Sequence, residues 1–146
     1  SFVFTGPEDD GFRQHRIHSL KNAYFTGQKK VDELPAYITA YDVCINPQMV
    51  NDITDGNYPL KIDEYLAMGK PTVATSTHTM RHIFADHTHL ATNPEEWLSV
   101  IDRAVTEADD KELAKQRIAF AETHSWGHSV KKIYGIIDNF LKEKAT

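Results

Sequence analysis

The sequence lacks several features that would assign the protein to other classes at once. Its 146 residues include one cysteine, Cys44, so no internal disulfide can form. A lone cysteine is typical of a reducing compartment, and we expect the cytoplasm. No run approaches the roughly 18 apolar residues of a membrane span, which predicts no transmembrane segment in this chain. An excess of positive charge is also missing, because the net charge is −5. That balance argues against a general nucleic-acid-binding surface.

What remains is the composition of an ordinary globular protein. Apolar residues make up 40% of the chain and charged residues 25%, both usual values. The length favours one domain, and a domain of this size buries roughly 68–70% of its unfolded surface. We find no internal repeats and no low-complexity segments.

Short β-rich runs alternate with segments of helical pattern along most of the chain. The predicted strands are 2–6, 22–27, 42–47, 71–76 and 88–92. The predicted helices are 31–41, 59–68, 93–108 with Asn93 as its N-cap, 109–124 and a last one that Ser125 caps. Such alternation is typical of βαβ units. The predicted fold class is therefore α/β, a Rossmann-like parallel sheet with helices on both faces and additional helices at the C-terminal end.

The segment "YPLKIDEYLAMGKPTVAT", residues 58–75, combines a helix, a tight turn and a strand. Pro59 suits the first position of the helix and Gly69 its end. In open α/β sheets ligands bind at the carboxyl ends of the strands, and this helix begins just after such an end. Its free N–H groups and its dipole favour an anion, with Lys61 beside it. Glu64, one turn further on, would reach a hydroxyl-bearing group attached to a bound phosphate.

A simpler interpretation of the same two residues stays open. Lys61 and Glu64 are three positions apart, so they could form a surface ion pair worth a few tenths of a kcal/mol. The proline before them, the Gly-Lys-Pro after them and the flanking strands favour the binding site instead.

Three segments in order resemble the C-terminal, donor-binding half of retaining GT-B glycosyltransferases, closest to family 4 (group 1) and its polysaccharide-synthesis relatives. They are "ELPAYITAYDVCINP" (33–47), "YPLKIDEYLAMGKPTVAT" (58–75) and the spaced set Arg117, Ala121, His124, Ser125 and Trp126. The likeness covers nearly the whole chain, and 59–73 is its most specific part. It implies transfer of a hexose from a nucleotide-sugar donor to a glycan or lipid-linked acceptor in polysaccharide biosynthesis, with no cofactor and no metal.

The resemblance also implies roles for individual residues. Lys61 is the expected catalytic residue, stabilising the diphosphate leaving group together with the helix N-terminus, and Glu64 would bind the ribose hydroxyls. The turn after Gly27 would lie near the base and Gly6 at a strand end facing the cleft. The full set of expected substrate-binding residues is Glu64, Tyr58, Pro59, Leu60, Gly27, Gln28, Gly6 and Asn57.

Two departures from the family pattern affect these expectations. Many members carry a second glutamate eight residues before the ribose glutamate, whereas this chain has Gly56 there, with Asp55 and Asn57 as possible substitutes. The chain also starts at what resembles the second strand of the family domain. We therefore expect 1–146 to be a single donor-binding domain that lacks its first strand and helix and the whole acceptor domain. Such a fragment would be inactive alone, and its parent enzyme could be peripheral at the inner membrane face.

Other interpretations carry less weight. His78 and His82 are four residues apart, as are His124 and His128, but no Glu or Cys partners complete a metal site. Cys44 fits a small buried hydrophobe better than a nucleophile. A non-catalytic α/β module of the response-regulator kind is the alternative function, because "TGPEDDG" (5–11) would supply an acidic cluster at a strand end. The last helix carries apolar residues that need a partner. Base, sugar, acceptor, linkage and oligomeric state do not follow from the sequence.

Overall fold

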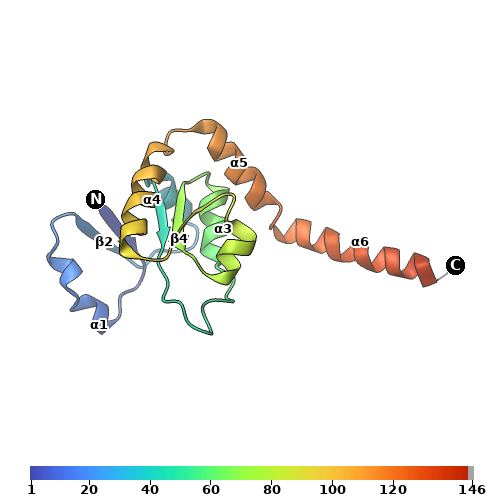
Figure 1. The fold of residues 1–146 in the computed structure, drawn as a ribbon, viewed down its shortest axis with the longest axis horizontal. Coiled ribbons are helices and arrows are strands. Elements are labelled where there is room, and N and C mark those ends of the chain that lie inside the picture. Colours follow the sequence, from blue (N-terminus) through green and yellow to red (C-terminus); the bar gives the residue numbers. More distant parts are fainter. Residues whose placement is uncertain (145–146) are drawn as a thin grey trace. The chain divides into compact units, whose positions relative to one another are not determined.

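The computed structural model describes residues 1–144 and shows a mixed α/β chain with parallel strands and C-terminal helices (Figure 1). The chain divides into two compact units, residues 1–37 and the part from Ile38 onward. All five predicted strands are present and pair in parallel, in one sheet of two strands and another of three.

The first unit is built on two strands, β1 (Phe2–Thr5) and β2 (Ala23–Gly27). Between them lie a short helix α1 (Asp10–Arg13) and a 3₁₀ turn η1 (Arg16–Ser19). An aromatic cluster holds this unit together. The rings of Phe4 and Phe25 stack at 5.1 Å, and the His18 imidazole lies 3.9 Å from the Phe25 ring. Because no residue among 1–37 is fully buried, this cluster substitutes for a deeper core.

The second unit is built on a sheet in the order β3–β4–β5. Its strands are β3 (Cys44–Asn46), β4 (Thr72–Thr75) and β5 (His89–Ala91). The helices before and between the strands are α2 (Leu34–Ala40), α3 (Leu60–Ala67) and the π-helix η2 (Met80–Phe84). All four residues of the central strand β4 are buried, including the polar residues Thr72 and Thr75.

The core of this unit lies where α3 and η2 meet the sheet. Ile62 and Leu66, one turn apart on α3, are completely buried, as are Met80 and Phe84 of η2. Burial of one such side chain contributes about 1.5–3 kcal/mol. Tyr65, Leu90 and Phe120 pack at the edge of this cluster.

The C-terminus of α3 is closed by a Schellman motif. The N–H of Lys70 donates to the Tyr65 carbonyl at 3.0 Å and that of Gly69 to Leu66 at 2.8 Å. Gly69 has φ +72°, a conformation that glycine adopts most easily. A Cβ at this position would also lie 3.1 Å from the Cβ of Ala114. Glycine is thus required here both by backbone conformation and by packing.

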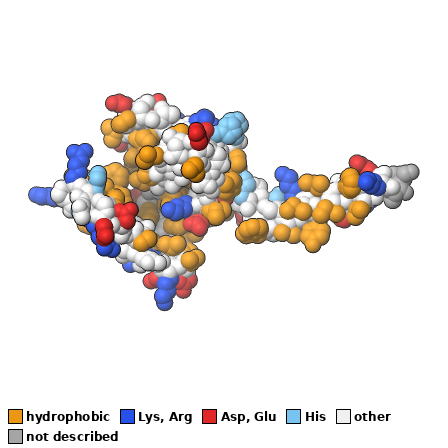
Figure 2. Space-filling model, turned by 90° about the horizontal axis from the view of Figure 1, so that it is seen from below, with side chains coloured by type: hydrophobic (Ala, Val, Ile, Leu, Met, Phe, Trp, Pro, Cys, Tyr) orange, Lys and Arg blue, Asp and Glu red, His pale blue; other side chains and the backbone are white. Residues whose placement is uncertain are grey.

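Three further helices follow, α4 (Pro94–Thr106), α5 (Lys111–Glu122) and α6 (Trp126–Lys144). Asn93 caps α4 by accepting from the Glu96 N–H, and the Ser125 hydroxyl accepts from the His128 N–H at the start of α6, both as predicted. No residue of α6 is buried among those described, and Figure 2 shows hydrophobic side chains gathered along it. In residues 1–144 no helix is both long and apolar enough to cross a membrane.

Two predicted helix boundaries are wrong at their N-terminal ends. Helix α2 begins at Leu34 rather than 31, because residues 31–33 form a turn that the Glu33 carboxylate closes onto the Lys30 N–H at 2.8 Å. Pro59 is the N-cap of α3 instead of its first helical residue, since its ψ of 88° lies outside the helical region.

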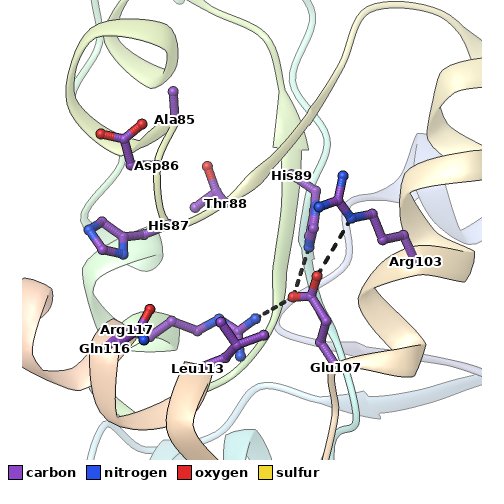
Figure 3. Close-up of a pocket in the computed structure, with 10 residues that line it drawn as sticks. All are labelled: Ala85, Asp86, His87, Thr88, His89, Arg103, Glu107, Leu113, Gln116 and Arg117. Carbon is purple, nitrogen blue, oxygen red and sulfur yellow. Dashed lines mark hydrogen bonds and ion pairs between the residues drawn. The ribbon is translucent and has the colours of Figure 1, made fainter. Parts of the chain in front are cut away.

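A charged cluster ties α4, α5 and the sheet together at the amino end of β5 (Figure 3). The Glu107 carboxylate accepts from the Arg117 guanidinium, lies 3.0 Å from His89 Nε2, and is 3.7 Å from Arg103 Nε. Arg117 also donates from Nη1 to the Gly69 carbonyl at 3.4 Å. Burial lowers the pKa of Arg117 and Glu107 opposes that shift. The adjacent cavity of about 270 Å³ is therefore bordered by charges that already satisfy one another.

We predict that Glu107→Gln destabilises the protein by about 3–5 kcal/mol, because it leaves the buried Arg117 charge without a counter-ion. Urea unfolding followed by circular dichroism measures the change. Glu112→Gln is the matched control, since Glu112 makes only an exposed ion pair with Lys115 at 3.6 Å, and such pairs contribute about 0–1 kcal/mol. Equal loss in the two variants would contradict the structural role of the cluster.

Cys44 offers a second test of the core. Its side chain is 4% exposed, and burial raises the pKa of the thiol to about 12, with a smaller opposite effect of Lys70. At about pH 8 only roughly one folded thiol in ten thousand is then ionised. We predict negligible reaction with a disulfide reagent at that pH and full reaction of one thiol per chain in denaturant. Rapid reaction of the native protein would refute the burial of this residue.

Candidate functional site

The chain topology places the N-terminus of α3 at the carboxyl edge of the β3–β4–β5 sheet. Helix α3 connects the carboxyl end of β3 to the amino end of its parallel neighbour β4, so it runs opposite to both strands. The Gln48 N–H, just after β3, donates to the Thr75 hydroxyl at the end of β4 at 2.8 Å. The loop that leads to α3 therefore leaves from the edge where ligands bind in sheets of this kind.

That loop is held against the segment that follows β4. The Asp55 carboxylate accepts from the His78 N–H at 2.6 Å, and the Asp55 carbonyl accepts from the Thr79 N–H at 3.2 Å. Arg81 lies 4.0 Å from the same carboxylate. Of the two residues beside Gly56, Asp55 is thus engaged in fixing the loop. Asn57 is exposed, and its side chain makes no hydrogen bond within the described chain.

The first turn of α3 presents unused polar groups. Its N-cap, Pro59, provides no capping side chain. Lys61 and Glu64 are both exposed, and neither side chain forms a hydrogen bond or ion pair with another residue of 1–144. The structure therefore does not contain the Lys61–Glu64 surface pair that their spacing allows. A positive helix end, an ammonium group and a carboxylate are left available for a ligand.

Two residues near this turn, Asp63 and His124, form a contact that the sequence does not predict. Asp63 accepts from the Tyr58 hydroxyl at 2.7 Å and lies 2.8 Å from His124 Nδ1, which belongs to the junction of α5 and α6. Burial, and then Asp63, raise the pKa of Tyr58. Nothing in the sequence signals the Asp63–His124 contact, because 61 residues separate the two partners. Of the predicted residues in this unit, those from Asn57 to Glu64 lie together around the helix end.

The other predicted residues belong to the first unit, at the carboxyl ends of β1 and β2. The Gly6 N–H donates to the Gly27 carbonyl at 3.1 Å, which brings these two residues together. Gly27 has φ +69° and turns the chain sharply out of β2. An open hollow of about 640 Å³ follows, lined by Gln28, Lys29, Lys30, Val31 and Glu33.

The structure brings no group of three or more His, Cys, Asp or Glu side chains together in a metal-binding arrangement within the described residues. His78 and His82, which are suitably spaced in sequence, stack at 4.0 Å instead, and His82 Nδ1 lies 2.9 Å from the His78 carbonyl. The acidic residues that follow β1, Glu8 and Asp9, also contact different groups instead of converging on one site. Glu8 pairs with His18 at 3.0 Å and Asp9 caps α1.

The sequence is also similar to those of known proteins. The profile of the family described as "Glycosyl transferases group 1" matches residues 1–110. The chain is 26% identical over 140 residues to a Bacillus subtilis (strain 168) protein named "Putative teichuronic acid biosynthesis glycosyltransferase TuaH". The match covers 91% of this chain and 35% of that relative, so the chain spans about a third of the relative's length.

Proposed function

The chain belongs to the group 1 glycosyltransferases, and we propose that it binds the diphosphate and ribose of a nucleotide-sugar donor at the N-terminus of α3. The observation that carries this proposal is the pair Lys61 and Glu64, exposed and unpaired beside an uncapped helix end at the carboxyl edge of a parallel sheet. Such an edge is where ligands bind in open α/β folds.

The diphosphate would lie against the first turn of α3. Backbone N–H groups and the helix dipole favour negative charge there, and Lys61 adds a full positive charge. When the bond to the sugar breaks, negative charge grows on the leaving diphosphate. Donors that are already in place stabilise this charge without having to reorganise. Lys61 is accordingly the residue we propose for catalysis, although it forms no bond to the sugar.

Glu64 would bind the ribose. It lies one turn beyond Lys61, and its carboxylate has no other partner in the described chain. A carboxylate accepts hydrogen bonds from both hydroxyls of a ribose, each worth roughly 1.5–3 kcal/mol.

The whole enzyme would transfer a hexose, with retention of configuration, to a glycan or lipid-linked acceptor in polysaccharide biosynthesis. The name of the relative, which refers to teichuronic acid biosynthesis, supports the polysaccharide assignment. Because this chain matches only 35% of that relative, we propose that the acceptor is bound by a domain outside residues 1–146. The chain alone would then bind the donor without completing the transfer.

A response-regulator module is less compatible with the site. That function needs acidic side chains converging on Mg²⁺. Here Glu8 contacts His18, Asp9 caps α1, and Asp10 lies 3.5 Å from Arg13. Titration with acetyl phosphate and magnesium separates the two functions, because a donor-binding domain responds to a nucleoside diphosphate and not to acetyl phosphate.

The ribose assignment predicts a specific loss in Glu64→Gln. We expect its affinity for the preferred ribonucleoside diphosphate, found by calorimetric titration with UDP, GDP and ADP, to fall by roughly 10- to 150-fold. Affinity for the 2′-deoxy analogue should fall less, since one of the two hydroxyls is already absent. Glu95→Gln, an exposed glutamate in the first turn of α4, is the matched control. Equal binding by Glu64→Gln and wild type would refute the role of Glu64.

The diphosphate assignment predicts that Lys61→Ala weakens binding of the same nucleotide by roughly tenfold or more, because two unit charges 4 Å apart near a protein surface attract by about 4 kcal/mol before solvent competition. Wild-type affinity should also fall between about 0.05 M and 0.5 M salt, and less steeply in the variant. Lys111→Ala, at the first turn of α5, serves as control. An unchanged salt dependence in Lys61→Ala would place the phosphates elsewhere.

A further inference from the structure

One carboxylate joins three separate segments next to the proposed phosphate site. Asp63 lies in the first turn of α3 and uses both of its oxygens. Oδ2 accepts from the hydroxyl of Tyr58, just before the helix, at 2.7 Å, and Oδ1 lies 2.8 Å from Nδ1 of His124, between α5 and α6. The side chains of Asp63 and His124 are 21% and 22% exposed. They are therefore partly shielded from water, unlike Lys61 and Glu64.

The chemistry of these contacts fixes where the protons lie. An ionised carboxylate only accepts hydrogen bonds, so Nδ1 of His124 must carry a hydrogen and Tyr58 must keep its own. The raised pKa of Tyr58 agrees with this arrangement. His124 Nε2 then remains available to accept a bond when the ring is neutral and to donate one when it is charged.

Both aromatic partners are also held by packing. The Tyr58 ring lies 5.5 Å and the His124 ring 5.7 Å from the ring of Phe84, which is completely buried. The His124 ring contacts Phe120 edge-on at 4.5 Å. The two groups bonded to Asp63 are thus anchored on the same core side chain, so the carboxylate cannot turn freely toward the helix end.

This arrangement fixes the chain as it enters α3, although it does not cap the helix amides. Pro59 supplies no capping side chain, and the Ile62 N–H donates to the Pro59 carbonyl at 2.9 Å. Tyr58 precedes the N-cap and Asp63 is the fourth helical residue, the two positions whose side chains meet in a hydrophobic staple. Here a hydrogen bond connects these positions and determines the direction in which the chain enters α3.

The negative charge of Asp63 is unfavourable next to a bound diphosphate, and its hydrogen bonds to Tyr58 and His124 reduce this effect. A carboxylate favours the helix N-terminus in the free protein but repels a diphosphate bound there. With one oxygen bonded to the Tyr58 hydroxyl and the other to the His124 imidazole, its charge is partly compensated. We propose that Tyr58, Asp63 and His124 are a positioning network that orients the entrance of α3 for the diphosphate and compensates the charge of Asp63, an inference that rests on the proposed function.

The test uses four variants of the 146-residue chain: Tyr58→Phe, Asp63→Asn, His124→Ala and His124→Asn. Each is titrated by calorimetry with the diphosphate that binds wild type best among UDP, GDP, dTDP and ADP. NMR gives the affinity for the corresponding nucleoside, which has no phosphate. Thermal melting reports stability separately. Tyr24→Phe, a tyrosine that is 54% exposed in the first unit, is the matched control for loss of a hydroxyl.

We expect Tyr58→Phe and His124→Ala to bind the diphosphate about five- to tenfold more weakly, the effect of one lost hydrogen bond, while binding of the nucleoside stays the same. His124→Asn should recover most of the affinity, because its amide N–H can replace Nδ1–H. Asp63→Asn separates orientation from charge. The asparagine side chain keeps one oxygen that can accept a hydrogen bond from Tyr58 or His124, and it carries no negative charge. The diphosphate affinity of Asp63→Asn should therefore fall by less than that of His124→Ala.

Three outcomes would overturn the inference. If the variants melt at lower temperature but keep the wild-type ratio of diphosphate to nucleoside affinity, the network only stabilises the fold and the proposed function stands. If His124→Asn is as weak as His124→Ala, the donor from Nδ1 is not what matters. If wild type binds none of the four diphosphates, the proposed function itself fails, and the role of the network at that site fails with it.

Discussion

The packing of α3 against the neighbouring strands β3 and β4 is the constraint on which the rest of the second unit depends. Its C-terminal end is fixed by the turn at Gly69, whose carbonyl accepts from Arg117, and Arg117 is in turn held by Glu107. Ile62 and Leu66, which are buried in the core, hold one face of the helix against the sheet. Because α3 connects two parallel neighbouring strands, fixing its C-terminal end and its buried face puts its N-terminal end at the carboxyl edge of the β3–β4–β5 sheet. The geometry at the start of α3 is therefore linked to contacts made at the opposite end of the same helix.

Much of this fold could be predicted because local patterns and tertiary structure agree. The apolar run around Cys44, the Gly69 end of α3 and the Asn93 cap are short-range signals. The features that were missed are long-range ones. Arg117 occupies a buried position on α5 that an apolar pattern would not assign to arginine, and its contacts with Glu107 and the Gly69 carbonyl satisfy it there. The positions of Lys61 and Glu64 on the helix follow from the sequence, whereas the Asp63–His124 contact requires the folded chain.

An overall charge of −5 does not prevent a local site for an anion. Long-range repulsion between exposed charges is screened beyond about 8 Å at physiological ionic strength. The field at the start of α3 is therefore set by groups within that distance, chiefly the helix amides, Lys61 and Asp63. Asp63 has the unfavourable sign, as does Glu64 one position further on, but Asp63 is bonded through both of its oxygens. The overall composition therefore does not argue against the local diphosphate site that we propose.

The distribution of hydrogen bonds along α3 explains why one end is suited to a ligand. Backbone groups at a helix end need partners from outside the helix. At the C-terminal end the fold supplies them through Gly69, Lys70 and Arg117. At the N-terminal end Pro59 offers no side chain that can cap the helix. The acidic residue of the first turn, Asp63, is bonded to Tyr58 and His124 instead of to the helix amides. An acidic residue that could have capped the helix is thus held away from it, and a phosphate can take the place that a capping carboxylate would otherwise occupy.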